Sequence, residues 1–314
     1  MLKLTYLNEN FSLARLALTH WAHDEATLDA RLRWFRISSN AVYPFDREGH
    51  LCFLRLTPEE EKPAAHILAE LEFLTHLQAA DYPALRPIPA KDEQLLLTLS
   101  TPWGRWHACA FTGVPGKPIE DIPLTEDVLT RYGGALGRLH ALSMNLDVPP
   151  ARPSFADALD WAWVYIRQGP EEMQAEYRAV RDALSRLPRE KSTFGLVHYD
   201  FEPDNVFFDG TDCHVIDFDD SMRHFYAIDL VQALDEMPQE AHASFLAGYY
   251  AACPQSGAKE ADFPLMRRFR DLYSWARLKH ALEDVPAEQP EWMPGLIERL
   301  MGKMRALEER ICRR

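Results

Sequence analysis

The sequence predicts an α+β protein of two lobes, a small lobe with an antiparallel sheet and one main helix, followed by a larger, mainly helical lobe. Short apolar segments separated by turn-forming residues dominate the first third of the chain. From Thr125 onward, apolar residues recur at helical spacing. One strand-rich segment, residues 194–218, interrupts the helical part and carries several acidic side chains.

Local patterns place the elements of the small lobe. A helix is expected over residues 11–21, and a longer helix opens at Pro63 after three glutamates, because proline and acidic residues favour the first helical turn. The apolar stripe of this second helix consists of Ile67, Leu71, Leu74 and Leu77. The predicted strands cover residues 34–37, 41–43, 51–54, 94–99 and 106–112.

The boundary between the lobes is expected where the last of these strands ends. It runs into Gly113-Val114-Pro115-Gly116, a sequence in which regular structure must break. We therefore predict a small lobe over residues 1–112 and a large lobe over residues 113–314.

The composition limits the classes of partner. A net charge of −14 argues against nucleic acid, because binding to a phosphate backbone depends on clustered Lys and Arg. The negative charge suits a cationic substrate, although solubility is the stronger explanation for it. No apolar run approaches the roughly 20 residues of a membrane-spanning helix, and the start of the chain lacks the apolar core of a signal peptide. We expect a cytoplasmic protein without a membrane partner, and the five scattered cysteines predict neither disulfides nor a zinc site.

The polar residues that point to chemistry lie in one segment. Residues 198–220 read HYDFEPDNVFFDGTDCHVIDFDD, so two apolar strands carry Asp200, Asp217 and Asp219 beside Asn205. Buried carboxylates are costly unless a cation compensates them, and a divalent metal would do so. Mg²⁺ takes carboxylate and amide oxygens together with phosphate oxygens, which suits Asn205 and Asp217 and leaves Asp200 to face a hydroxyl nucleophile. The segment predicts a phosphoryl-transfer site.

This segment resembles the catalytic and metal-binding loops of the aminoglycoside phosphotransferase and choline kinase superfamily, a phosphotransferase enzyme family related to protein kinases. Further segments that follow the family's order are residues 40–43, 53–56, 70–74, 133–140 and 228–230. The resemblance implies a protein-kinase-like fold with an N-terminal nucleotide-binding lobe and a C-terminal lobe for catalysis and the acceptor. It implies that Asp200 is the catalytic residue and that Asn205 and Asp217 bind magnesium. Asp219 is either a further metal ligand or a structural residue.

In the small lobe the resemblance implies a set of nucleotide-binding residues. Arg55 stands where the family has a phosphate-binding Lys or Arg, and Glu70 stands where it has that residue's ion-pair partner. Helical spacing supports Glu70 independently, because it lies three residues after Ile67 on the apolar stripe. A Ser-Ser-Asn segment takes the place of a glycine-rich loop. The predicted set is Ser38, Ser39, Asn40, Arg55, Glu70 and Phe111.

Two features bear on the acceptor. Tyr199 stands where relatives have Gly or Arg, and its bulk is expected to crowd the acceptor. Trp161, Trp163 and Tyr165 form either a cage for a quaternary ammonium group or part of the packing, and packing is the stronger interpretation.

The expected function is ATP- and magnesium-dependent transfer of a γ-phosphoryl group to a hydroxyl of a small molecule, such as an aminoglycoside, an amino alcohol, homoserine or a sugar. Two alternatives are a bacterial stress-type protein Ser/Thr kinase, which has a similar Asp219-Asp220 ending, and a nucleotide-binding module without catalysis. The sequence identifies neither the acceptor nor the oligomeric state, and it does not separate ATP from GTP.

Overall fold

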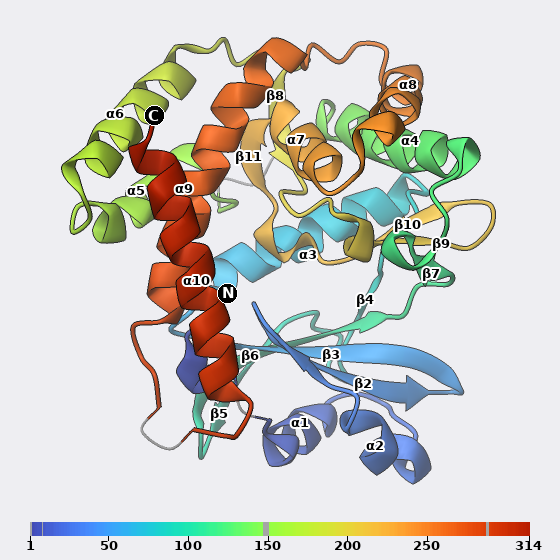
Figure 1. The fold of residues 1–314 in the computed structure, drawn as a ribbon. Coiled ribbons are helices and arrows are strands. Elements are labelled where there is room, and N and C mark those ends of the chain that lie inside the picture. Colours follow the sequence, from blue (N-terminus) through green and yellow to red (C-terminus); the bar gives the residue numbers. More distant parts are fainter. Residues whose placement is uncertain (1, 8, 147–150, 287–288) are drawn as a thin grey trace.

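The computed structural model describes residues 2–7, 9–146, 151–286 and 289–314. It has the predicted α+β plan of two lobes, with a sheet-based lobe next to a mainly helical one and helix α3 running between them (Figure 1). The elements of the small lobe are α1 (Phe11–Leu18), α2 (Glu25–Leu32), β1 (Arg36–Ile37), β2 (Ala41–Arg47), β3 (His50–Pro58), α3 (Ala64–Ala79), β4 (Pro87–Ile88), β5 (Leu97–Thr101) and β6 (Gly104–Thr112). The division after residue 112 coincides with the end of β6 and stays a prediction.

The sheet of the small lobe is antiparallel. Its strands follow the order β1-β2-β3-β6-β4, and β5 also pairs with β6. In the β3–β6 register, Arg55 lies opposite Cys109 and Phe53 lies opposite Phe111. The sheet therefore brings two predicted nucleotide-binding residues, Arg55 and Phe111, onto neighbouring strands.

Two elements of the small lobe were not predicted, the two-residue strand β4 and helix α2. Helix α2 ends at Leu32, and its buried Leu28 and Leu32 are four residues apart, as one helical face requires. Of the strand expected over residues 34–37, only Arg36 and Ile37 pair with β2. Trp34 is 81% exposed, so this aromatic residue does not mark a buried strand.

The large lobe consists mainly of helices. Its elements are β7 (Lys117–Pro118), α4 (Glu126–Ser143), α5 (Phe155–Ile166), α6 (Glu171–Arg186), β8 (Phe194–Val197), β9 (Val206–Phe208), β10 (Cys213–Val215), β11 (Met222–Phe225), α7 (Ala227–Asp235), α8 (His242–Ala252), α9 (Phe263–Ala281) and α10 (Met293–Cys312). The strand-rich segment contributes the β9–β10 hairpin and β8, which pairs with β11. No described helix is long and apolar enough to cross a lipid bilayer.

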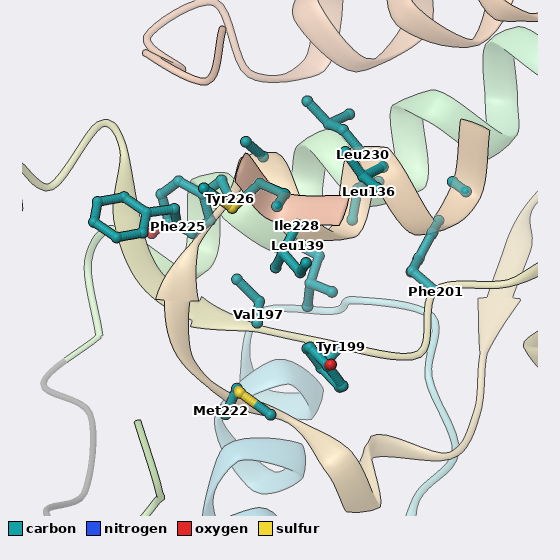
Figure 2. Packing of buried hydrophobic residues seen from close by; sticks show 14 of the residues in the cluster. Leu136, Leu139, Val197, Tyr199, Phe201, Met222, Phe225, Tyr226, Ile228 and Leu230 are labelled. Atoms are coloured by element: carbon teal, nitrogen blue, oxygen red, sulfur yellow. The ribbon is translucent and has the colours of Figure 1, made fainter. Parts of the chain in front are cut away.

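The core of the large lobe supports the strand that leads into the predicted catalytic loop. Leu139 of α4 and Ile228 of α7 lie beside Val197, the last residue of β8, and all three are fully buried (Figure 2). Burying three such side chains contributes on the order of 1.5–3 kcal/mol each. The loop that begins after Val197 thus starts from a strand that is held in the core.

Helices α4 and α8 pack so closely that their contact requires glycine. A Cβ atom on Gly133 would lie 1.9 Å from the carbonyl oxygen of Phe245, whereas one on the adjacent Gly134 would lie 3.8 Å from its nearest neighbour. We expect Gly133→Ala to lower the free energy of unfolding by about 2–3 kcal/mol. Gly134→Ala is the matched control and should stabilise by about 0.5–1 kcal/mol through helix propensity. Urea unfolding measures both, and equal shifts would contradict the packing described here.

Acid sensitivity is expected from a buried histidine. His224 lies between the rings of Phe155 and Phe269, with centroid distances of 5.5 and 4.6 Å, and burial lowers its pKa to about 3. The unfolded chain binds a proton near the ordinary pKa of 6.5 while the folded chain does not, so stability falls as the pH drops below 6.5.

Replacement of His224 by phenylalanine should remove this loss. Between about pH 7.5 and pH 5, the wild type should lose about 2 kcal/mol more of its free energy of unfolding than His224→Phe does. Exposed His50→Gln serves as the control and should keep the wild-type dependence. Parallel pH profiles for wild type and His224→Phe would show that this histidine is not the source.

The start of the chain packs against the last two helices. Leu2, Leu4 and Leu7 form an apolar cluster with Leu278 of α9 and Leu300 of α10. In Figure 1 the N-terminus lies beside α10, the red helix that runs from the side of the sheet to the helical lobe, where the C-terminus lies near α6. This cluster joins the start of the small lobe to the last two helices.

Candidate active site

The loop after β8 carries the predicted catalytic residue, and a buried carboxylate fixes its backbone. Asp229, in the first turn of α7, accepts hydrogen bonds from the backbone N–H groups of His198 and Tyr199, both at 2.8 Å. The ring of His140 lies 3.0 Å from the same carboxylate. Tyr199 has a φ of 65°, a left-handed conformation that a bulky residue keeps only when its surroundings hold it there. Asp229 therefore positions the loop from a helix 30 residues farther along the chain.

His198 braces this loop by hydrogen bonds of both ring nitrogens. Its Nε2 lies 2.9 Å from the carbonyl oxygen of Ile216, and its Nδ1 accepts the backbone N–H of Asp200 at 3.2 Å. Burial lowers the pKa of His198, which keeps the ring neutral. The ring thus ties the loop before Asp200 to the segment before Asp217.

Asp200 and Asn205 lie next to each other. The Asn205 side-chain amide donates to the Asp200 carboxylate at 2.9 Å and to the Asp200 carbonyl at 3.0 Å. Burial raises the pKa of Asp200 well above its ordinary value, and the negative charges of Asp220 and Asp217 add to the rise. The carboxylates of this region therefore lie close enough together to repel one another.

Asp217 occupies the end of the strand-rich segment in an unusual conformation. Its φ of 61° and ψ of 60° are left-handed, and it precedes a single 3₁₀ turn, Phe218–Asp220. Phe218 anchors this turn, because its buried ring packs against Phe73 of α3 and His198 at centroid distances of 5.7 and 4.5 Å. Burial and Asp219 raise the pKa of Asp217 to about 6, against the opposing effect of Arg55.

Arg55 and Glu70 form a buried bidentate ion pair between β3 and α3. The two Nη–Oε distances are 2.8 and 2.7 Å, and the Glu70 side chain is fully buried. The guanidinium also lies over the Phe111 ring, 5.0 Å from its centroid. A fork of this kind holds the arginine in one orientation. The predicted pairing of Arg55 with Glu70 is thus present, and Phe111 lies under the arginine.

The Ser-Ser-Asn segment lies between β1 and β2. Asn40 is buried, and its side-chain oxygen accepts the Thr57 hydroxyl at 2.6 Å. The Ser39 hydroxyl lies 3.4 Å from the Arg277 guanidinium. The Ser38 N–H donates to the Asn40 carbonyl at an N–O distance of 3.1 Å. The segment therefore closes on itself and faces the helical lobe through Ser39.

Residues 38–254 match the model of the Phosphotransferase enzyme family, which is more than half of the chain. The chain belongs to this family. Among curated relatives, the homoserine kinase of Rhodospirillum rubrum is 29% identical over 267 residues, which cover 76% of this chain and 78% of that protein. The amicoumacin kinase of Bacillus subtilis is 21% identical over 64% of this chain, and the chain spans only 61% of that relative's length.

Solved phosphotransferase structures share the fold. An amicoumacin kinase in complex with AMP-PNP, Ca²⁺ and its ligand Ami superposes with a TM-score of 0.75 at 16% identity, covering 98% of this chain and 95% of that one. A microcompartment-associated aminopropanol kinase gives a TM-score of 0.71 at 24% identity, covering 96% and 97%. The predicted protein-kinase-like fold is confirmed.

The phosphotransferase site has the right chemistry for a hard divalent cation. The carboxylate of Asp217 makes no ion pair with a described residue, although neighbouring acids raise its pKa. Mg²⁺ is held in such sites by one or two protein oxygens together with phosphate oxygens and water. Asn205 and Asp217 fit this minimal ligand set.

Asp219, the third candidate ligand, is engaged by cations. Its carboxylate lies 2.5 Å from Lys62 and 3.6 Å from Arg55. Burial opposes ionisation, but Lys62 and Arg55 together hold the pKa of Asp219 below its ordinary value. Its position in this structure is therefore that of an ion-pair partner, and a role as metal ligand stays a prediction.

A cavity of about 380 Å³ adjoins the phosphotransferase site. The turn before α3, helix α5, residues 219–222 and helix α9 form its walls. Trp161 and Tyr273 supply aromatic surface, with ring centroids 5.7 Å apart, and Lys62, Asp220 and Arg277 supply charge.

The structure bears on two expectations about the acceptor. Tyr199 is not among the residues that line this cavity: it is 3% exposed and packs against Phe269 and Tyr273, of which Tyr273 lines the cavity. The expected crowding of an acceptor stays a prediction. Trp163 stacks on Tyr177 at 4.7 Å, which separates it from Trp161. The three aromatic residues therefore do not form one cage: Trp163 packs on Tyr177, whereas Trp161 lines the cavity.

Three cations of the site were not predicted. Lys62 contacts Asp219, and its place after three glutamates is a signal that could have identified it. Arg152 is buried and donates to the carbonyl oxygens of Phe218 and Asp219 at 2.8 and 2.9 Å. Arg277 lies 2.6 Å from Asp220. No local pattern marks Arg152 or Arg277, because each reaches the site from a distant segment.

Proposed function

We propose that this chain is an ATP- and magnesium-dependent kinase that transfers the γ-phosphoryl group to a hydroxyl of a small molecule. The observation that carries the proposal is the placement of Asp200, hydrogen-bonded to Asn205 and close enough to Asp217 for the two carboxylates to influence each other's charge. A nucleophile-activating carboxylate beside a metal-binding amide and carboxylate is the arrangement that phosphoryl transfer requires.

Each residue then has a separate task. Asp200 orients the acceptor hydroxyl and takes its proton as the hydroxyl oxygen bonds to the γ-phosphorus. The bond between that phosphorus and the β–γ bridging oxygen breaks, and ADP leaves with the electron pair. Arg55, held by Glu70, would fix the α- and β-phosphates. Bound Mg²⁺ would neutralise charge on the triphosphate, and Asn205 and Asp217 are the residues that would hold it.

The remaining predicted residues would surround the nucleotide. The Ser38–Asn40 segment can offer backbone N–H and hydroxyl groups to phosphate oxygens, in place of a glycine-rich loop. Phe111 lies beneath Arg55 and is the penultimate residue of β6, next to the predicted lobe boundary, so it would contact the nucleotide near the base. A role for Asp219 as second metal ligand would require it to leave Lys62.

The cavity supports a small acceptor over a protein. Its volume of about 380 Å³ falls within the range of about 300–1,000 Å³ that small-molecule sites occupy. Helices α5 and α9 contribute to its wall on the side of the large lobe. The similar proteins are named as kinases of homoserine, amicoumacin and aminopropanol. We therefore place amino alcohols and related hydroxyl compounds first among the acceptors.

An acceptor screen tests the proposal. The protein is incubated with ATP and Mg²⁺ and with homoserine, aminopropanol, choline, aminoglycosides or sugars, and the release of ADP is followed. We expect one chemical class to raise ADP release well above the rate with water. If no acceptor does so although the protein binds ATP, the result supports a nucleotide-binding module without catalysis. If label from ATP appears in proteins of a lysate instead, the result supports a protein kinase.

A further inference from the structure

One side chain of the cavity, Arg277, contacts both the Ser38–Asn40 segment of the small lobe and the loop after Asp217 in the large lobe. Arg277 belongs to α9, and its Nη2 lies 2.6 Å from the Asp220 carboxylate and 3.4 Å from the Ser39 hydroxyl. Ser39 lies between β1 and β2 in the small lobe, and Asp220 lies three residues after Asp217. A guanidinium from the C-terminal part of the chain thus reaches the place where the phosphate segment and the metal-binding loop face each other.

This guanidinium retains donors for a ligand. Within the part of the chain that the structure describes, neither its Nε nor its Nη1 donates a hydrogen bond. The side chain is 22% exposed and lines the cavity next to Tyr273, whose ring centroid lies 5.7 Å from the guanidinium carbon. A planar cation with free donors in such a place suits phosphate oxygens.

Another arginine of the same helix shows what a purely structural pair looks like. Arg267 holds Asp235 with Nε at 3.0 Å from both carboxylate oxygens and Nη2 at 2.6 Å from one of them. Neither Arg267 nor Asp235 lines the cavity. Arg277 differs because it engages its acid through one nitrogen and extends to Ser39 as well.

We propose that Arg277 is a catalytic residue that donates hydrogen bonds to the γ-phosphoryl group during transfer, an inference that rests on the proposed function. As the bond to the β–γ bridging oxygen breaks and the bond to the acceptor oxygen forms, negative charge is spread over the equatorial oxygens of the transferred group. A cation fixed between Ser39 and Asp220 stabilises that charge in the transition state more than in bound ATP. Asp220 keeps the guanidinium in place without occupying all its donors.

The test compares Arg277→Gln and Arg277→Lys with Arg267→Gln as the matched control on the same helix. Steady-state rates are measured with the acceptor found in the screen. Calorimetry measures the affinity for Mg·ADP with and without aluminium fluoride, which mimics the phosphoryl group in the transition state. We expect Arg277→Gln to lower kcat by about 10²–10³-fold, with both KM values changed less than about threefold. It should lose the additional affinity that aluminium fluoride confers. Arg277→Lys should recover part of both, and Arg267→Gln should behave as the wild type.

Other outcomes overturn the inference. An acceptor KM that rises while kcat is unchanged would make Arg277 an acceptor-binding residue, and retained affinity for the fluoride complex would exclude contact with the transferred group. If Arg277→Gln does not fold, Arg277→Lys serves as the test variant, because lysine keeps the positive charge but lacks the planar set of guanidinium donors. An unchanged kcat in Arg277→Lys overturns the inference. These results leave the proposed function intact. A wild-type protein that binds neither Mg·ATP nor the fluoride complex would overturn both.

Discussion

Replacement of Asp200 by asparagine is expected to lower kcat for acceptor phosphorylation by about 10²–10⁴-fold. Asparagine has the same shape and can still accept the Asn205 hydrogen bond, which measures 2.9 Å in the wild type. It cannot take the proton of the acceptor hydroxyl. Binding of Mg·ATP, followed by thermal shift, should therefore change little while turnover is lost.

The control for this variant is another acid of the same segment. Asp209 lies in the β9–β10 turn, where its carboxylate accepts the backbone N–H groups of Thr211 and Asp212, both at 2.8 Å. Asp209→Asn should keep the wild-type kcat. Full activity in Asp200→Asn would remove this residue from the mechanism.

Replacement of Asp217 by asparagine should have an effect of similar or larger size but of another kind. The substitution removes the one charged oxygen ligand that the proposed magnesium site takes from the chain, so kcat/KM for ATP is expected to fall by about 10³-fold or more. The structure around it should survive, because Phe218 and its contacts with Phe73 and His198 anchor the turn.

A magnesium titration separates the two aspartates. Mg·ATP should raise the melting temperature of Asp200→Asn as it does that of the wild type, whereas Asp217→Asn should show a much smaller rise at any concentration of Mg²⁺. The wild type with EDTA is the reference for the metal-free state. An equal stabilisation of both variants by Mg·ATP would contradict the assignment of Asp217 to the metal.

The candidate residues that lie within one short segment of the chain could be predicted from the sequence. Asp200, Asn205 and Asp217 follow one another in a segment of alternating apolar and polar residues, and the structure brings Asp200 and Asn205 into direct contact. The pair of Arg55 and Glu70 could be predicted because one ends a strand and the other lies on the inner stripe of the next helix.

Residues that reach the site from far along the chain could not be predicted. Arg152 and Arg277 contact the loop after Asp217 through tertiary structure alone, and nothing in their neighbouring sequence distinguishes them from the other arginines of the chain. The role of Asp229 as acceptor for two backbone N–H groups became visible only with the fold. Helix α2 was missed because its eight residues carry only two buried leucines, Leu28 and Leu32, which is a weak periodic signal.

Tyr199 shows that the size of a residue does not reveal where its side chain lies. Its backbone is left-handed, and its buried ring packs against Phe269 and against Tyr273, which lines the cavity. Sequence spacing cannot indicate such a turn, because a positive φ is uncommon for an aromatic residue. The acceptor is therefore expected to be selected by α5 and α9, which wall the cavity.

The central claim is that this chain moves a phosphoryl group from ATP to a small-molecule hydroxyl. Mass spectrometry and phosphorus NMR of the reaction with the best acceptor test it most directly. The account predicts one phosphate monoester of the acceptor for each ADP formed, and no product with Asp200→Asn. Formation of ADP and inorganic phosphate without a phosphorylated acceptor, or phosphate found on protein side chains, would contradict it.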